Sequence, residues 1–154
     1  MAGYFLLKLV HVLGACILFG TGLGIAFFMW MANRKGDVAV IAGTARIVVI
    51  ADAVFTAVAV VAQPSTGAAL ASVTGVSLRS PWIVASLALY LIVGSCWLPV
   101  VAIQIRMRDL AAAARDAGTS LPVQYHRLFR AWFILGWPAF AGVIAIFALM
   151  IAKP

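Results

Sequence analysis

Two side chains inside the apolar stretches of this chain have types that could do chemistry. His11 carries an imidazole, which in its neutral form binds haem iron, transfers protons or makes ordinary hydrogen bonds. Asp52 carries a carboxyl group, and an acid within a membrane span is costly enough to be a functional candidate. An ion pair between Asp52 and Arg46 or Arg106 is the structural alternative. On the sequence alone, all of these roles stay open.

A short segment, QPSTG at residues 63–67, supplies further polar groups. Its proline removes a backbone donor, which would either open carbonyl groups toward a ligand pocket or only kink the helix. By depth along their helices, Tyr90 and Met150 belong in the same region as His11. The sequence therefore predicts a cofactor site with haem b as the cofactor and His11 as the metal ligand. The contributing residues are His11, Gln63, Tyr90 and Met150.

The sequence lacks the residues and motifs that several reaction classes require. There is no Glu, no paired carboxylate, no phosphate-binding glycine loop, no GxSxG and no CxxCH for covalent haem. Cys16 and Cys96 lie in apolar runs without metal-ligand spacing, and we interpret them as small buried thiols. Hydrolase and ATPase functions are therefore disfavoured, whereas a redox cofactor needs few protein groups because it carries the chemistry itself. The residues do not decide whether the protein is an enzyme, and they name no catalytic residue.

The elements that position these groups must be membrane helices. The chain has 154 residues, of which 66% are hydrophobic and 10% are charged. A soluble domain is closer to half apolar and a quarter charged, so this composition excludes both a water-soluble globule and a disordered chain. We expect an all-α integral membrane four-helix bundle, formed by residues 1–154 as a single transmembrane domain.

Four runs are long enough to cross a membrane, which requires about 20 apolar residues. The predicted spans are residues 4–31, 46–70, 82–105 and 129–151. The first run is too long for a signal peptide and no cleavage site follows it. Arg46 would snorkel at the start of the second span, and Pro64 and Pro138 are expected to kink their helices. The other polar groups expected to be buried are Arg46, Asp52 and Thr56.

The basic residues indicate the orientation. Lys and Arg number 11 against 4 Asp and Glu, which gives a formal net charge of +7. Eight of the 11 fall in the first and third connections, so the positive-inside rule places these connections in the cytoplasm. Both termini then lie outside a bacterial inner membrane. Because the basic residues lie between apolar runs, we expect them to contact anionic lipid headgroups and not nucleic acid.

The third connection predicts an extended cytoplasmic hairpin between the third and fourth helices. Residues 106–117 are rich in alanine and contain no helix breaker, so the third helix should continue past the membrane until Gly118. Ser120 and Pro122 mark the next helix start. Charged side chains of the two arms are expected to meet, namely Arg106, Arg108, Asp109, Arg115 and Asp116 with His126, Arg127 and Arg130.

Helical periodicity of about 100° per residue places the polar groups on one face of each span. Polar side chains are costly against hydrocarbon, so these faces should meet in a shared polar interior. The faces contain His11, Ala15, Leu18 and Gly22; Asp52, Thr56, Ala59 and Gln63; Ser86, Tyr90, Val93, Trp97 and Gln104; and Trp132, Gly136, Ala139, Val143, Ile146 and Met150. Gly20 and Gly24 form a GxxxG pair that would allow a homo-oligomer or a membrane partner. His11 and His126 fall about 25–30 Å apart, so they cannot share one haem.

Blocks along nearly the whole chain resemble one protein family. They are LKLVHVLGA (7–15), LFGTGLG (18–24), QP and TG (63–67), CWLPVV (96–101), QIRMRDL (104–110), YHR (125–127), WF (132–133) and GWPA (136–139). Together they resemble an uncharacterised bacterial family of predicted four-span membrane proteins, domain-of-unknown-function family 2269. The resemblance implies the four-span architecture and no particular activity.

A weaker likeness is to the HemJ-type protoporphyrinogen oxidases, which are also small four-helix membrane proteins with b-type haem. The first-helix Leu-His block carries this likeness, and His11 corresponds to their first-helix haem ligand. Their second ligand is a lysine on the third helix, but this sequence has no Lys between Trp82 and Ile105. The likeness therefore implies haem at His11, with Met150, a water or an open position opposite.

Three functions follow as predictions. The leading one is a b-haem or porphyrin-associated redox protein with His11 as the axial ligand and with Gln63 and Tyr90 around it. The second is a structural or accessory membrane subunit without catalytic activity. The third is a proton-coupled small-solute carrier that uses Asp52.

Overall fold

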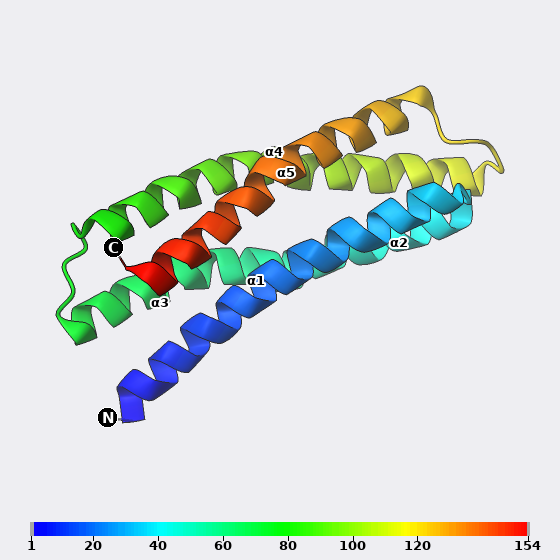
Figure 1. Ribbon diagram of the computed structural model, residues 1–154. Coiled ribbons are helices and arrows are strands. Elements are labelled where there is room, and N and C mark those ends of the chain that lie inside the picture. The colour runs from blue at the N-terminus through cyan, green and yellow to red at the C-terminus, as the bar shows by residue number, and fades with distance from the viewer. Residues whose placement is uncertain (1, 154) are drawn as a thin grey trace.

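The computed structural model describes residues 2–153, and every regular element in that range is helical. The elements are α1 (Ala2–Lys35), α2 (Val38–Ala51), the π-helical turn η1 (Asp52–Thr56), α3 (Ala57–Thr74), α4 (Pro81–Asp116) and α5 (Val123–Ala152) (Figure 1). Because α2, η1 and α3 follow one another without a break, they form one long rod. This rod and the other three helices are each long and apolar enough to cross a membrane. The all-α fold is confirmed, and the four long helices are consistent with a four-span membrane bundle.

The four rods run up and down in turn. Both described chain ends and the connection 75–80 therefore lie at one end of the molecule, and the connections 36–37 and 117–122 lie at the other (Figure 1). α1 packs mainly on α2 and α3, whereas α4 packs on α5 and α2. Contact between α1 and α5 is sparse. The bundle thus consists of two helix pairs that are joined chiefly through α2 and α4.

A glycine and an aspartate set the boundary between α1 and α2. Gly36 has a φ of 75°, a left-handed conformation that ends a helix at little cost only for glycine. The Asp37 carboxylate caps α2 by accepting hydrogen bonds from Ala39 N at 2.8 Å and Val40 N at 3.1 Å. The helix therefore begins at Val38, ahead of the membrane span predicted from residue 46, and the position of the membrane along this rod stays a prediction. The Gly36-Asp37 pair was the sequence signal for this earlier start.

Two expected burial assignments are wrong. Arg46 lies inside α2 but is exposed on the surface of the bundle. Cys16 is exposed as well, whereas Cys96 is partly buried. A cationic side chain on a membrane helix can rest its apolar stem against the bundle and extend its charge toward the lipid headgroups. Arg46 therefore does not need to enter the interior.

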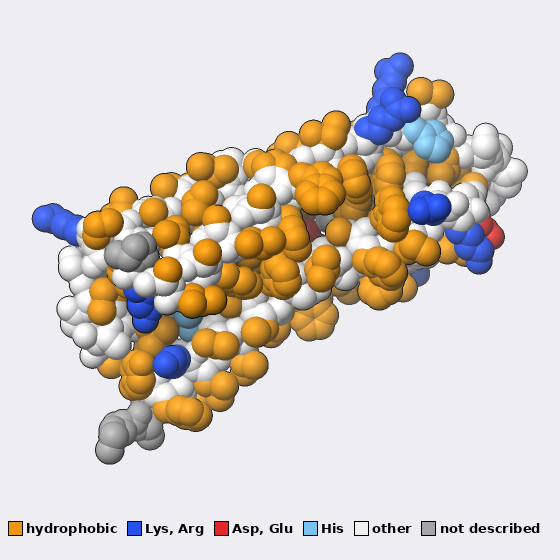
Figure 2. Space-filling view, in the orientation of Figure 1, with side chains coloured by type: hydrophobic (Ala, Val, Ile, Leu, Met, Phe, Trp, Pro, Cys, Tyr) orange, Lys and Arg blue, Asp and Glu red, His pale blue; other side chains and the backbone are white. Residues whose placement is uncertain are grey.

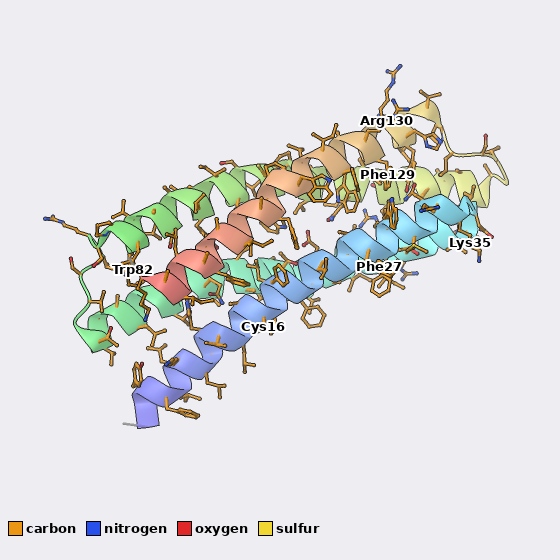
Figure 3. The ribbon with its side chains drawn as sticks, in the orientation of Figure 1. Cys16, Phe27, Lys35, Trp82, Phe129 and Arg130 are labelled. Carbon is orange, nitrogen blue, oxygen red and sulfur yellow. The ribbon has the colours of Figure 1, made fainter. Side chains whose placement is uncertain are left out.

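The surface separates into an apolar band and two basic ends. Figure 2 shows hydrophobic side chains over the middle of the visible face, with Lys and Arg side chains gathered toward both ends. Large apolar side chains within the candidate spans are strongly exposed, for example Phe27 (labelled in Figure 3), Leu91 and Ile134. Such exposure is unfavourable in water and favourable in hydrocarbon, so the surface agrees with insertion into a membrane.

The buried apolar core lies toward the end that holds the connections 36–37 and 117–122. Its largest fully buried side chains are Tyr125, Met29, Ile41 and Met107. Small residues fill the spaces between them and include Ala42, Ala45 and Ala111. Alanines at helix contacts allow the backbones to approach closely, which is how membrane helices gain packing energy.

The connection between α4 and α5 agrees in part with its prediction. α4 continues to Asp116, and Gly118 follows with a φ of 63°. Within residues 2–153, however, no ion pair joins the two arms; the pairs are Arg108–Asp109 at 2.7 Å and Arg115–Asp116 at 2.8 Å, both inside α4. Residues that are adjacent in the sequence can form an ion pair whatever the tertiary packing, so these pairs do not join the two arms. Where this segment lies relative to a membrane surface stays a prediction.

The helical bonding pattern changes at η1 and not at the prolines. The helices that contain Pro64, Pro99 and Pro138 continue through these residues. The α-helical pattern of the second rod is interrupted instead at residues 52–56, which form a single π-helical turn. Turns of this kind are rare and are frequently found at functional sites. This one begins with Asp52.

Candidate functional site

Most polar side chains of the spans face the interior, as the helical periodicity predicts. Ser65 and Ser95 are exposed, and their hydroxyls donate to carbonyls of their own helices. The buried ones, exposed by only 3–6%, are Asp52, Thr56, Ser86 and Gln104. The half-buried ones are His11, Gln63, Thr66 and Tyr90. They form two separate groups, one around His11 near the start of α1 and one around Asp52 beside η1.

His11 is held by α3 through two hydrogen bonds. Its Nδ1 atom lies 2.8 Å from Thr66 Oγ1, and Gln63 Nε2 donates to the His11 carbonyl oxygen at 2.9 Å. The Thr66 hydroxyl donates its single hydrogen to Ala62 O at 2.7 Å, so it accepts from His11 Nδ1. This assigns the imidazole proton to Nδ1. The lone pair is then on Nε2, which is the atom that could ligate a metal or accept a proton.

Two glycines allow α1 and α3 to approach at this level. A Cβ atom at Gly67 would lie 3.3 Å from His11 Cε1, and one at Gly14 would overlap the side-chain nitrogen of Gln63. Gly67 therefore makes room for the imidazole, and Gly14 makes room for the amide that reaches the α1 backbone. The close approach is typical of small residues at helix contacts in membranes.

Tyr90 lies next to the His11 group without entering it. Its hydroxyl donates a short hydrogen bond to Val60 O on α3, about one helical turn from Gln63. Tyr90 thus ties α4 to the same helix that holds His11. Its polar atom is already used by a backbone carbonyl.

Phe19 on α1 packs against two rings of α5: its centroid lies 5.1 Å from that of Phe140 and 5.6 Å from that of Phe147. α1 and α5 run in opposite directions, so Met150, three residues beyond Phe147, lies toward the same end of the bundle as His11. Of the four predicted cofactor residues, the structure therefore joins His11 and Gln63 and places Tyr90 beside them, whereas a role for Met150 opposite His11 stays a prediction.

Asp52 is the centre of the second group. Trp97 Nε1 donates to its Oδ1 atom at 3.4 Å. When the Gln104 amide is oriented to suit its neighbours, its nitrogen donates to Asp52 Oδ2 at 3.1 Å and its oxygen accepts from Trp132 Nε1 at 3.1 Å. Three rods thus contribute to one polar network, which we call the Asp52 network: Asp52, Trp97, Gln104 and Trp132.

The ion pair expected for Asp52 is not formed. Among residues 2–153, no nitrogen of Lys, Arg or His lies within 4.0 Å of its carboxylate. Arg46 and Arg106, the two expected partners, are both exposed. A bare carboxylate is costly inside a membrane, so Asp52 must either hold a proton or accompany a bound cation.

Thr56 lies one turn beyond Asp52, at the other end of η1. It is 6% exposed, and its hydroxyl has no hydrogen-bond partner within the described part of the chain. A buried hydroxyl without a partner is unfavourable. The π-helical turn therefore presents a carboxyl group and an unused hydroxyl to the interior.

A cavity of about 180 Å³, open on one side to the surface of the bundle, adjoins the Asp52 network between the second rod and α4. Asp52, Trp97 and Gln104 form part of its wall, but nearly all of the surface that it exposes is apolar. The remaining lining is apolar and consists of Val49, Ala53, Ala57, Val101 and Ile105. A mostly apolar cavity with a few convergent polar groups is the usual form of a small-molecule site.

The Asp52 network lies near the end that carries most of the basic residues. Arg46 precedes Asp52 by six residues, and Arg106 follows Gln104 by two. At 1.5 Å per residue the network is therefore about 3–9 Å from the level of these arginines. Figure 3 shows Arg130 at the same end, extended away from the bundle. Any solute in the cavity would lie below a rim of positive charge.

The sequence alone placed Trp97, Gln104 and Trp132 on interior faces but did not connect them with Asp52. The available signal was that side chains able to form hydrogen bonds lay on the predicted interior faces of three different rods. Which of them meet depends on the rotation and vertical offset of each helix. Those offsets are set by packing between distant segments, which periodicity within a single helix does not report.

Four long apolar helices, packed around an apolar core with a few buried polar side chains, define an integral membrane helix bundle. The comparison with protein families agrees: residues 5–154 match the family model described as Predicted integral membrane protein (DUF2269). The chain therefore belongs to this family, and the resemblance seen in its sequence blocks is confirmed. No curated protein matches the chain, and no solved structure matches it.

Proposed function

We propose that this protein is a proton-coupled carrier of small solutes, with Asp52 as its proton-binding group. One observation carries the proposal. Asp52 is 5% exposed, has no cationic partner among residues 2–153, and lines a cavity of about 180 Å³. Ionisable groups in such positions are typical of proton pathways and substrate sites in membrane proteins.

The neighbours of Asp52 can support both of its protonation states. In the ionised state, Trp97 and Gln104 each donate to one carboxylate oxygen. In the protonated state, the carboxyl hydrogen can be donated to a solute or to water in the cavity. Occupancy of the cavity and proton binding are then linked at one group, which is the coupling that such a carrier requires.

The sparse contact between α1 and α5 offers a place where the bundle can open. The two helix pairs are α4 with α5 and α1 with the second rod, and they are joined chiefly by the contact between α2 and α4. Separation of α1 from α5 would leave both pairs intact and would open the bundle about the α2–α4 contact. Rigid movement of one helix pair against the other is a common way to alternate access to a membrane site.

Asp52→Asn is expected to abolish solute-linked proton movement. The purified full-length protein would be placed in liposomes that contain a pH-sensitive dye, and glucose, alanine, acetate and isobutylamine would be added in turn. At least one solute should change the internal pH through the parent protein. Asparagine has nearly the same shape as aspartate but does not exchange a proton, so the variant should match protein-free liposomes.

Asp109→Asn is the matched control, because Asp109 is an exposed carboxylate that pairs with Arg108. It should leave the proton signal unchanged. A parent protein that gives no signal with any of these solutes would contradict the carrier function, as would an Asp52→Asn variant equal to the parent. Either result would favour the accessory-subunit function.

Haem binding at His11 is the second candidate, and one observation favours it. The bond from Nδ1 to Thr66 fixes the imidazole and leaves Nε2 as the atom for a metal. Gln63 and Tyr90 use their polar groups on backbone carbonyls. A haem at this position would be held by His11 Nε2 and would supply one-electron redox chemistry.

The haem candidate is tested by the visible spectrum of the detergent-purified protein. A Soret band should be present in protein from haem-replete cells and should be lost in His11→Ala. His126→Ala serves as the control, because His126 is exposed near the start of α5 at the far end of the bundle. A colourless parent protein, or a band that survives His11→Ala, would rule out this site.

We also propose that the connections 36–37 and 117–122 face the cytoplasm of a bacterial inner membrane, because the basic residues gather at that end. Ala113→Cys is expected to react with an impermeant thiol reagent only after cells are permeabilised. Leu78→Cys, in the opposite connection, should react in intact cells. Both positions are exposed, and both variants require Cys16 and Cys96 to be replaced by alanine. The reverse labelling pattern would invert the orientation.

A further inference from the structure

We propose that the cavity beside Asp52 binds a small protonatable amine, which enters in its neutral form and is held as an ammonium ion. This inference rests on the proposed carrier function and names the class of its substrate. It uses three features of the cavity: a buried carboxyl group without a cation, an indole, and an apolar remainder of limited volume.

The first step of the argument is charge. Asp52 needs one positive charge or one proton, and no Lys, Arg or His side chain within residues 2–153 supplies it. A bound solute can supply it only if the solute is cationic. Anionic solutes such as carboxylates would be repelled by an ionised Asp52, and neutral solutes such as sugars can neither take its proton nor compensate its charge. A base that takes the proton becomes a cation and forms an ion pair with the carboxylate.

The second step separates organic cations from divalent metal ions. Asp52 and Gln104 are the cavity residues that bring side-chain oxygens, and the Gln104 oxygen already accepts from Trp132. Calcium takes six to eight oxygen ligands, and magnesium takes about six in near-octahedral geometry. The described lining does not provide such a set. It does provide the Trp97 indole, and aromatic rings attract organic ammonium ions through their π faces.

The third step is size. The cavity measures about 180 Å³. A cavity of about 150 Å³ in another protein accepts benzene, so this one should accept a molecule of about six non-hydrogen atoms. Apolar residues on the far side, among them Val49, Val101 and Ile105, suit a short hydrocarbon chain. Isobutylamine has the right size and shape for a probe.

The fourth step is entry. Arg46 and Arg106 lie about 3–9 Å above the network and repel a cation that approaches from that end. A neutral amine is not repelled. Once in the cavity, its nitrogen lone pair takes the proton from the Asp52 carboxyl oxygen, so that one N–H bond forms as one O–H bond breaks. The products are an ammonium ion and a carboxylate, which then attract each other.

The test uses infrared difference spectra of the full-length protein in detergent, with isobutylamine as the probe and isobutanol as a neutral analogue of the same shape. Isobutylamine should remove the band of the protonated carboxyl group and produce a carboxylate band. Isobutanol should do neither. The change should be absent in Asp52→Asn and retained in Asp109→Asn, whose altered residue is exposed.

Binding affinity gives the second readout. Trp97→Leu should weaken isobutylamine binding, measured by calorimetry, by about tenfold, in line with a cation–π contact. Trp97→Phe retains an aromatic face and should lose less. It also keeps the test valid if Trp97→Leu does not fold. Equal binding of isobutylamine and isobutanol, or equal affinity in both Trp97 variants and the parent, would overturn the amine site.

The liposome measurement separates this inference from the proposed function. If glucose, alanine or acetate moves protons in an Asp52-dependent way and isobutylamine does not, the carrier function stands and the amine class is wrong. If no solute moves protons, both are wrong. If isobutylamine moves protons and Asp52→Asn abolishes the movement, both are supported.

Discussion

Tyr125→Ala is expected to lower the free energy of unfolding by about 3–5 kcal/mol, the range found when large aromatic side chains are removed from packed cores. Tyr125 has 0% exposure and belongs to the core that also contains Met29, Met107 and Ala111. All four rods contribute to this core, so the surrounding helices cannot easily collapse into the space left behind. Unfolding of the detergent-solubilised protein in increasing dodecyl sulfate, followed by circular dichroism, would measure the loss.

Tyr125→Phe is the matched variant for this prediction. The Tyr125 hydroxyl is buried without a hydrogen-bond partner in the part of the chain that the structure describes. Its removal should therefore change stability by less than about 1 kcal/mol, because at most a weak contact with the Asn33 side chain is lost. If Tyr125→Phe is as destabilising as Tyr125→Ala, the hydroxyl and not the ring stabilises this core.

Much of the fold could be predicted because lipid penalises polar groups so strongly. His11, Asp52 and Gln104 lie far from one another in the sequence. Because polar side chains are costly in hydrocarbon, all three could be predicted to lie on interior faces. The structure confirms those faces, with Gln104 at 4% exposure and Asp52 at 5%. The same reasoning needs only the period of a helix and no knowledge of its neighbours.

The partners of these residues could not be predicted in the same way. Arg46 was a plausible partner for Asp52 by distance along the chain. Six residues correspond to about 600° of rotation, which is one full turn plus about 240°. The two side chains therefore point about 120° apart around the helix axis. Asp52 instead meets Gln104 and Trp97, more than 40 residues away. Contacts of that kind depend on how whole helices are placed against each other.

The two candidate sites are far enough apart to be tested independently. Thr66, which binds His11, and Asp52 belong to the same rod and are separated by 14 residues. At 1.5 Å per residue the separation is about 21 Å. Effects of substitutions at such distances are usually additive. A result at the His11 group therefore neither supports nor weakens the proposal for Asp52.

Gln104→Leu is expected to destabilise the protein by about 2 kcal/mol. Leucine matches glutamine approximately in size, so little packing is lost, but Asp52 Oδ2 loses its donor and Trp132 Nε1 loses its acceptor. Each buried polar group left without a partner costs about 1 kcal/mol or more in proteins, and membrane values reach a similar size. Gln124→Leu, at an exposed position of α5, is the control and should have almost no effect.

A double-mutant cycle shows whether the loss comes from the network. In a Trp132→Phe background the indole N–H is already absent, so Gln104→Leu can orphan only the Asp52 oxygen. Its cost should fall by roughly 1 kcal/mol, and the difference is the coupling between Gln104 and Trp132. Strictly additive losses would mean that the two side chains are not bonded. In that case the Gln104 amide would have no fixed orientation, and Asp52 would lose the donor that supports its ionised state beside the cavity.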